Sequence, residues 1–147
     1  MIVVRRAGAE DHAAINAIVQ TSSAYDGVYR AILDKYEVPV TQIVDEETWL
    51  AVDCDGALGF YSLLIEPQPE LDLMFVSDAA QGRGVGKLLF SHMRARAGAR
   101  GAAAVKIVSH PPALNFYRRM GAIEVGLAYP LDAVTWARPI LSLPISR

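Results

Sequence analysis

The spacing of apolar residues along the first third of the chain predicts one strand followed by two helices. Residues 2–7 form a short strand-like run, and Ile15, Ile18 and Val19 after it would lie on one face of a helix. A second helical stretch is expected to end before Pro39, because the residue ahead of a proline avoids the helical region.

The middle of the chain predicts a hairpin and then a strand, a turn and a helix. Two strand-like runs, residues 49–53 and 57–65, are separated by a turn that has glycine at its end, Gly56. A third run, residues 71–76, passes into a polar, glycine-containing stretch, and helical spacing resumes at Val85.

The last third predicts a strand, a helix and a tail of strands. Residues 104–108 are strand-like, and the prolines that follow are well placed to start a helix over 113–120. Prolines at 130, 139 and 144 indicate that the tail strands lie at an edge, since proline cannot donate to a central ladder. We expect an α/β fold with a single mixed, mostly antiparallel sheet and helices on both faces, forming one domain over residues 1–147.

Composition excludes several classes of protein. Hydrophobic residues make up 52% of the 147 residues, too many for a disordered chain, yet no apolar run reaches the roughly 18 residues of a membrane span. A net charge of −2 gives no general attraction for nucleic acid or anionic lipid. The single cysteine permits no intrachain disulfide, and the N-terminus places apolar residues before charge, unlike a secretory signal. We expect a cytoplasmic protein with no membrane or nucleic-acid partner.

The stretch Gln81-Gly-Arg-Gly-Val-Gly86 lies between a predicted strand and a predicted helix, where backbone N–H groups and the helix dipole converge. Its three glycines let the main chain approach an anion closely, and Arg83 and Lys87 add positive charge. The stretch therefore predicts a diphosphate site. Two nucleotide motifs fail on spacing, because a P-loop needs glycine at position 81 and the dinucleotide motif needs it at 87 or 89.

The pattern that fits is Q-x-x-G-x-G, formed by Gln81, Gly84 and Gly86, which resembles the pyrophosphate-binding turn of the GNAT superfamily of acyl-CoA-dependent N-acetyltransferases. Residues 113–122, Ala-Leu-Asn-Phe-Tyr-Arg-Arg-Met-Gly-Ala, resemble the second signature of that superfamily. The resemblance covers nearly the whole chain. It implies a fold whose strands splay apart at the CoA site, and acetyl-CoA as the co-substrate.

The resemblance also implies roles for individual residues. Backbone groups of Phe75 and Val76 would pair with the amides of pantetheine, and Tyr117 would be the general acid that protonates the CoA thiolate. The further cofactor-binding residues that it implies are Gln81, Gly82, Arg83, Gly84, Val85, Gly86, Lys87, Asn115 and Phe116.

The candidate bases are Glu70 and Asp72, since strand side chains two residues apart share a face. A solvated strand start explains both carboxylates as well, and relatives can rely on water instead. Where relatives commonly carry Asn, this chain has His110, which could replace that hydrogen-bonding group, act as a base or be structural. The three histidines match no metal spacing, so no metal is expected.

The implied activity is transfer of an acetyl group from acetyl-CoA to a primary amine of a small molecule or peptide, by direct attack. One alternative is a catalytically silent CoA-binding sensor or accessory module, and another is a ligand-free interaction domain. The acceptor pocket is expected around Tyr25, Tyr29, Tyr129 and Trp136. The apolar C-terminal strand could pair across a homodimer.

Overall fold

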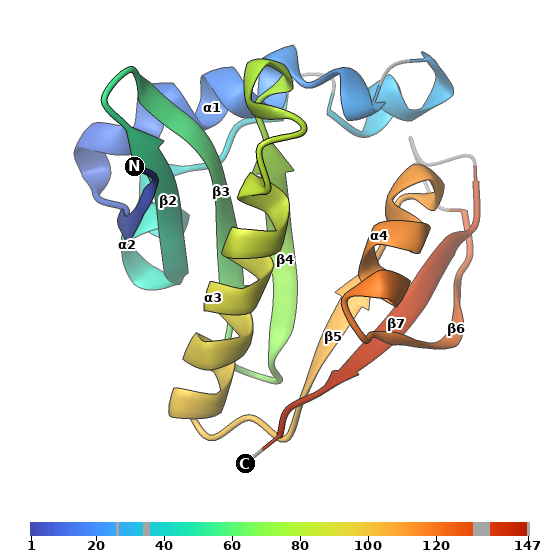
Figure 1. Ribbon diagram of the computed structural model, residues 1–147. Coiled ribbons are helices and arrows are strands. Elements are labelled where there is room, and N and C mark those ends of the chain that lie inside the picture. The colour runs from blue at the N-terminus through green and yellow to red at the C-terminus, as the bar shows by residue number, and fades with distance from the viewer. Residues whose placement is uncertain (26, 34–35, 131–135, 147) are drawn as a thin grey trace.

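The computed structural model describes residues 1–25, 27–33, 36–130 and 136–146. Within these ranges, seven strands form one sheet in the order β1-β2-β3-β4-β5-β7-β6, in which only the β4–β5 pair is parallel (Figure 1). This confirms the expected fold class. The strands are β1 (Val3–Arg6), β2 (Glu47–Asp53), β3 (Gly56–Leu64), β4 (Glu70–Val76), β5 (Ala104–Val108), β6 (Ile123–Ala128) and β7 (Arg138–Pro144).

Helices cover both faces of the sheet. The α-helices are α1 (His12–Thr21), α2 (Val40–Asp45), α3 (Val85–Ala99) and α4 (Leu114–Arg119). Apolar residues of α1 and α2 share one core with Phe60, while residues of α3 and α4 share a second core with Tyr61. Because these two neighbours in β3 point to opposite faces, both faces of the sheet centre are buried.

Among the described residues, the second predicted helical stretch is present only as 3₁₀ helix, and as expected it ends before Pro39. The chain between α1 and Pro39 contains the 3₁₀ segments Ser23–Tyr25 and Gly27–Ile32, and residues 34–35 lie outside the described part of the chain. The α-helix that follows, α2, was not predicted from the sequence, and its N-cap residue is Pro39 with extended backbone angles. Proline at a helix start loses no hydrogen bond, because the first N–H groups of a helix have no partner within it.

The prediction that the proline-containing tail lies at an edge is wrong for β7. This strand pairs with β5 on one side and with β6 on the other. Its prolines lie near its two ends, at Pro139 and Pro144, and the carbonyl of Pro139 still accepts a hydrogen bond from the Ser109 N–H at 2.9 Å. With both sides of β7 paired, the C-terminal strand is not the one that could extend the sheet across a homodimer, and the end of the sheet is β6.

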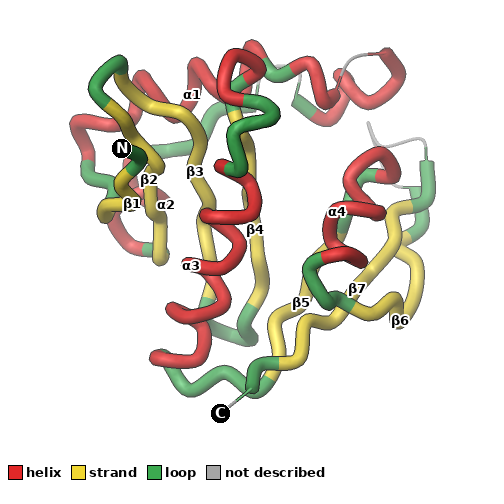
Figure 2. Tube along the Cα trace, in the orientation of Figure 1, coloured by secondary structure: helices red, strands yellow, loops and turns green. Residues whose placement is uncertain are grey.

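Strands β4 and β5 part soon after they meet. Only Glu70–Lys106 and Leu71–Ile107 are in register, and farther along the strands diverge (Figure 2). On its other side β4 stays paired with β3, where the register steps from Leu71 to Leu73 and skips Asp72. The sheet is therefore continuous at one end and open at the other.

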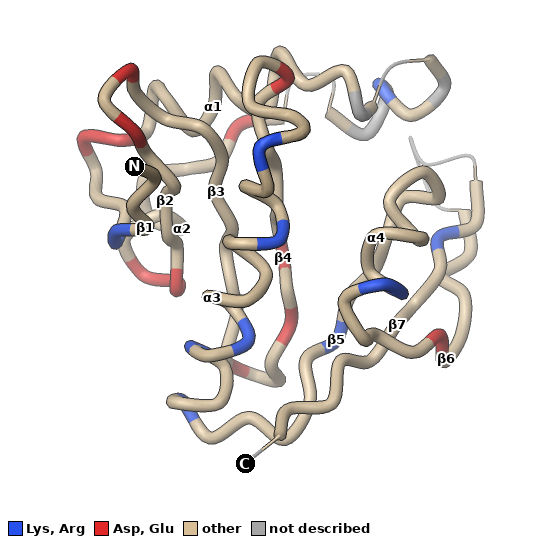
Figure 3. Tube along the Cα trace, viewed as in Figure 1, with Lys and Arg blue, Asp and Glu red and all other residues tan. Residues whose placement is uncertain are grey.

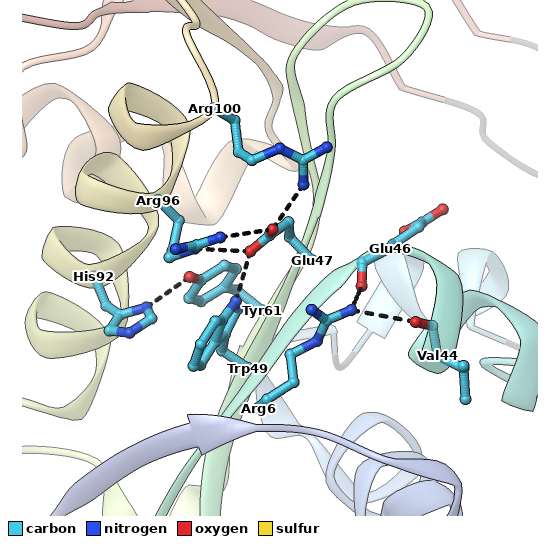
Figure 4. A network of polar contacts seen from close by, with 9 residues as sticks. All are labelled: Arg6, Val44, Glu46, Glu47, Trp49, Tyr61, His92, Arg96 and Arg100. Atoms are coloured by element: carbon cyan, nitrogen blue, oxygen red, sulfur yellow. Dashed lines mark hydrogen bonds and ion pairs between the residues drawn. The ribbon is translucent and has the colours of Figure 1, made fainter.

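A polar network fastens α3 to the β2–β3 hairpin (Figure 4). The carboxylate of Glu47 accepts hydrogen bonds from Arg96 Nε at 2.9 Å, from Arg100 at 2.7 Å and from the Trp49 indole at 2.9 Å. Only 5% of its side chain is exposed, and the hydrogen bond from Arg96, the largest influence, lowers the pKa of Glu47 to about 2. Close by, the Tyr61 hydroxyl and His92 Nδ1 are hydrogen-bonded at 2.7 Å.

Replacing Glu47 by Gln is expected to lower the free energy of unfolding at pH 7 by about 1–3 kcal/mol, because the charge-assisted hydrogen bonds are lost. The folded-state pKa of Glu47 is below its ordinary value of 4.5, so this stability is present above pH 4.5 and is lost as the pH falls towards 2. Urea unfolding between pH 2 and 7 should therefore show a shallower pH dependence in Glu47→Gln. Glu124, in an exposed ion pair with Arg118, is the control, and Glu124→Gln should change stability by no more than about 1 kcal/mol. Equal effects of the two substitutions would contradict the assignment.

Candidate active site

Two cavities flank the opening between β4 and β5. The first, of about 480 Å³, lies on the α3 and α4 side, and the second, of about 450 Å³, lies on the α1 side next to β7. The residues that line both cavities are Tyr25, Leu71, Asp72, Leu73, Phe75, Val108 and His110. The two cavities therefore meet through the sheet where its strands part.

The glycine-containing turn opens onto the first cavity. Gly82 and Gly84 have φ of 80° and 77°, and Gly84 is the N-cap of α3. A Cβ on either would meet no atom within 4 Å, so the space in front of both is open. Among the described residues, none accepts a hydrogen bond from the N–H groups of Gly82, Gly84, Val85 or Gly86. The turn is thus a cluster of free donors at a helix N-terminus, which suits an anion.

Most of the cofactor-binding residues named from the sequence line the first cavity: Phe75, Val76, Gln81, Gly82, Gly84, Val85, Gly86, Lys87 and Phe116. The side chain of Gln81 donates to the carbonyl of Val76 at 3.2 Å, which closes the turn. A Cβ on Gly86 would lie 3.5 Å from the Phe116 ring, so the two signatures pack against each other.

Two of the named residues lie apart from the cavity lining. Arg83 is ion-paired with Asp53 of the β2–β3 hairpin at 3.0 Å, and Asn115 is exposed on α4. Arg119 lines the first cavity and was not assigned a role from the sequence, although the basic stretch of the second signature contains it. Basic residues therefore lie on both sides of the opening, at the start of α3 and on α4 (Figure 3).

Two tyrosines stand at the junction of the cavities. Tyr117, on α4, lines the first cavity, and burial raises the pKa of its hydroxyl, with the nearby Tyr25 hydroxyl adding to the shift. Tyr25 lines both cavities and stacks on His110 at 4.1 Å and on Phe75 at 5.4 Å between ring centroids. Burial raises the pKa of Tyr25 to about 12. Both hydroxyls keep their protons at neutral pH and can donate them.

The two candidate bases lie in the second cavity. Glu70 lines the second cavity and Asp72 lines both. Asp72 accepts a hydrogen bond from the Gln42 side chain at 2.7 Å. Partial removal from water raises the pKa of Asp72, and the hydrogen bond from Gln42 partly opposes that shift.

Of the four aromatic residues expected around the acceptor pocket, all of which the structure describes, only Tyr25 lines either cavity. Tyr29 packs edge-on against Trp136 at 4.8 Å and against His110 at 6.1 Å. Tyr129 is 78% exposed and lines neither cavity. Residues 131–135, between Tyr129 and Trp136, lie outside the described part of the chain.

The described residues contain neither a helix that could span a membrane nor a group of side chains that could bind a metal ion. No helix there is long and apolar enough to cross a bilayer. No group of three or more His, Cys, Asp or Glu side chains there is arranged to hold a metal ion.

Comparisons with known proteins identify the fold. A family model described as an acetyltransferase (GNAT) domain matches residues 44–121. A GCN5-related N-acetyltransferase structure from Rhodopseudomonas palustris is similar over 97% of this chain and 94% of that chain, with 21% identity and a TM-score of 0.79. The ribosomal-protein-S18-alanine N-acetyltransferase of Escherichia coli is similar over 100% and 96%, with 18% identity and a TM-score of 0.76. The PaiA N-acetyltransferase of Thermoplasma acidophilum, solved in complex with coenzyme A, is similar over 98% and 99%, with 16% identity and a TM-score of 0.74. No curated protein matches the chain.

Replacing Gly84 by Val is expected to abolish binding of CoA while the core stays folded, because the new side chain would fill the open space before the free N–H groups. A side chain at positive φ also costs about 1–2 kcal/mol of stability. Gly101 is the matched control, since it has φ of 83° and an equally open surrounding, in the turn that follows α3. Gly101→Val should show a similar loss of stability with unchanged CoA affinity by calorimetry. Normal CoA binding by Gly84→Val would place the anion site elsewhere.

Proposed function

The chain belongs to the GNAT acetyltransferase family, and from this premise we propose that it transfers an acetyl group from acetyl-CoA to a primary amine of a small molecule or peptide by direct attack. The observation that carries the proposal is the pair of cavities that meet between β4 and β5. A thioester approaching from one face and an amine approaching from the other would touch there. No covalent intermediate on the protein is then needed.

The first cavity fits CoA at several points. Its glycine turn offers the free N–H groups of residues 82 and 84–86 to a pyrophosphate, next to the N-terminus of α3, and Lys87 adds charge. Beyond Leu71, β4 has no register partner in β5, so the backbone near Phe75 and Val76 is placed to pair with the amides of pantetheine. The Thermoplasma acidophilum neighbour, whose structure contains coenzyme A, supports this reading. Arg83 is ion-paired with Asp53, so we propose that it contributes positive charge near the turn without contacting the pyrophosphate. We assign the exposed Asn115 to the outer edge of the site.

The proposed chemistry needs a base and an acid. The amine nitrogen attacks the thioester carbonyl carbon, the carbon–sulfur bond breaks, and the amine proton leaves to Glu70 or Asp72, directly or through water. The sulfur leaves as a thiolate and takes a proton from Tyr117, whose raised pKa keeps its hydroxyl protonated until the thiolate forms. Tyr117 lines the first cavity and Glu70 lines the second. This arrangement matches proton donation to the thiolate on one face of the sheet and proton abstraction from the amine on the other.

The alternative is a catalytically silent CoA-binding module, and His110 is the residue that favours it, since it stands where relatives commonly carry Asn. Its ring stacks on Tyr25 and lines both cavities. Binding of CoA without turnover would identify such a module. Binding and turnover must therefore be measured separately.

CoA and acetyl-CoA are expected to stabilise the protein against heat. Ligand at one hundred times its Kd should add about 2.7 kcal/mol to the free energy of unfolding. NAD and ATP serve as control ligands, because the turn has neither of their motifs. Release of free thiol from acetyl-CoA in the presence of a panel of amines then tests turnover. A shift with ATP or NAD and none with CoA would overturn the proposal.

Replacing Tyr117 by Phe is expected to lower kcat by about 10²–10⁴-fold with acetyl-CoA affinity changed by only a few-fold, because only the proton donor is lost. Tyr61→Phe is the matched control, since that hydroxyl bonds His92 in the network on α3 and lines neither cavity. The control should lose about 1 kcal/mol of stability and keep its turnover. Full activity in Tyr117→Phe would remove the hydroxyl from the mechanism.

A further inference from the structure

The second cavity carries charges of both signs on opposite walls. Glu70 and Asp72 line it from β4, while Lys106 lines it from β5 and Arg138 from the start of β7. The same separation is visible along the strands, with acidic positions on β4 and basic positions on β5 and β7 (Figure 3). A cavity with this polarity favours a ligand that has a cationic end and an anionic end.

The four charges do not compensate each other equally. Glu70 and Lys106 are register partners on the adjacent strands β4 and β5, so their opposite charges start from neighbouring positions in the sheet. Asp72 and Arg138 have no such relation, because β5 lies between their strands. Among the described residues of this cavity, Asp72 on β4 and Arg138 on β7 are therefore the two charged residues without an oppositely charged register partner.

Arg138 lacks an anionic partner in the described part of the chain. Its Nε is buried and has no hydrogen-bond partner, and no described carboxylate forms an ion pair with it. A buried donor on a cation is costly to leave unsatisfied, and with no acceptor for this nitrogen among the described residues, a ligand could supply one. The indole Nε1 of Trp136, two residues earlier, is a second buried donor without a partner among the described residues.

The position of Arg138 connects this charge to the place of reaction. Its positive charge opposes the rise that burial produces in the pKa of Tyr25, so the guanidinium lies within electrostatic reach of the Tyr25 hydroxyl. The Tyr25 hydroxyl in turn influences the pKa of Tyr117 in the first cavity. A small anion at Arg138 would thus lie in the cavity that Tyr25 and Asp72 also line, within electrostatic reach of the Tyr25 hydroxyl.

We propose that the acceptor amine is a free α-amino acid, with its carboxylate bound by Arg138 and its amino group directed towards Asp72 and the opening between β4 and β5. Guanidinium and carboxylate match in shape and can form two parallel hydrogen bonds. Leu33, Tyr36 and Ile140, which line the same cavity, would contact an apolar or aromatic side chain. This inference rests on the proposed acetyl transfer and adds the class of acceptor.

An amine without a neighbouring carboxylate fits the cavity less well. It would bring a positive charge next to Arg138 and leave the buried guanidinium nitrogen without an acceptor. The N-terminus of a peptide offers Arg138 an amide carbonyl, which can accept a hydrogen bond but carries no negative charge to neutralise the guanidinium. Amino acid amides therefore serve as probes for both simple amines and peptide ends.

The test measures kcat/KM by thiol release from acetyl-CoA for the common amino acids, for their amides and for the corresponding decarboxylated amines. The native protein is expected to prefer at least one free acid over its amide by about 10- to 100-fold, the range of a hydrogen bond to a charged group. Arg138→Gln should lower that ratio by a similar factor, and Arg138→Lys should restore part of it. Arg118→Gln, which removes an exposed arginine that lines neither cavity, should leave the ratio and the turnover unchanged.

The outcomes distinguish the proposed acetyl transfer from the proposed amino acid acceptor. CoA-induced thermal stabilisation of each variant checks that the fold and the first cavity are intact. Amides or simple amines accepted as well as the free acids would overturn the amino acid assignment and leave acetyl transfer standing. A ratio that is the same in the native protein and in Arg138→Gln would also overturn the assignment. Binding of CoA with no thiol release for any amine would overturn the proposed function and this inference with it.

Discussion

Between β4 and β5 the sheet keeps only two pairs of residues in register, and the rest of the molecule is arranged around that opening. A strand that loses its neighbour exposes N–H and C=O groups that must find another partner. Here the exposed stretch of β4 lies beside the glycine turn that begins α3, with α4 across the gap. The place where the sheet stops being continuous is therefore the place where a ligand with amide groups can take over its hydrogen bonding.

An opening in a sheet persists only if each side is held independently. On one side, Glu47 fastens α3 to the β2–β3 hairpin through two arginines, and the strands beneath are buried on both faces. On the other side, α4 lies over the β5-β7-β6 part of the sheet (Figure 1). The two helices also touch, since Phe116 packs edge-on against Phe90 of α3 with ring centroids 5.9 Å apart. Helix α3 thus sets the width of the opening, because it is fixed to one side and in contact with the other.

The sequence predicts the parts of this arrangement that depend on local geometry. Glycines at 82, 84 and 86 signal positive φ and close approach to a ligand before a helix, and the structure has positive φ and open space at Gly82 and Gly84 but not at Gly86. The edge-strand prediction that rested on Pro139 failed, because the effect of proline depends on its place within an element, which spacing does not reveal; for the same reason the helix that begins after Pro39 was not predicted. The basic residues of the second cavity, Lys106 and Arg138, were also beyond the sequence. Arg138 reaches the cavity through the pairing of β7 with β5, which joins residues far apart along the chain.

The division of the lining residues between two cavities affects how such a protein can evolve. Seven residues of the second cavity also line the first, so substitutions among them alter both cavities at once. The others, which include Tyr36, Lys106, Arg138 and Ile140, line only the second cavity. Mutations at these positions can alter what enters the second cavity without touching the glycine turn. One fold can in this way give rise to proteins that differ in the ligand of the second cavity and keep the same glycine turn.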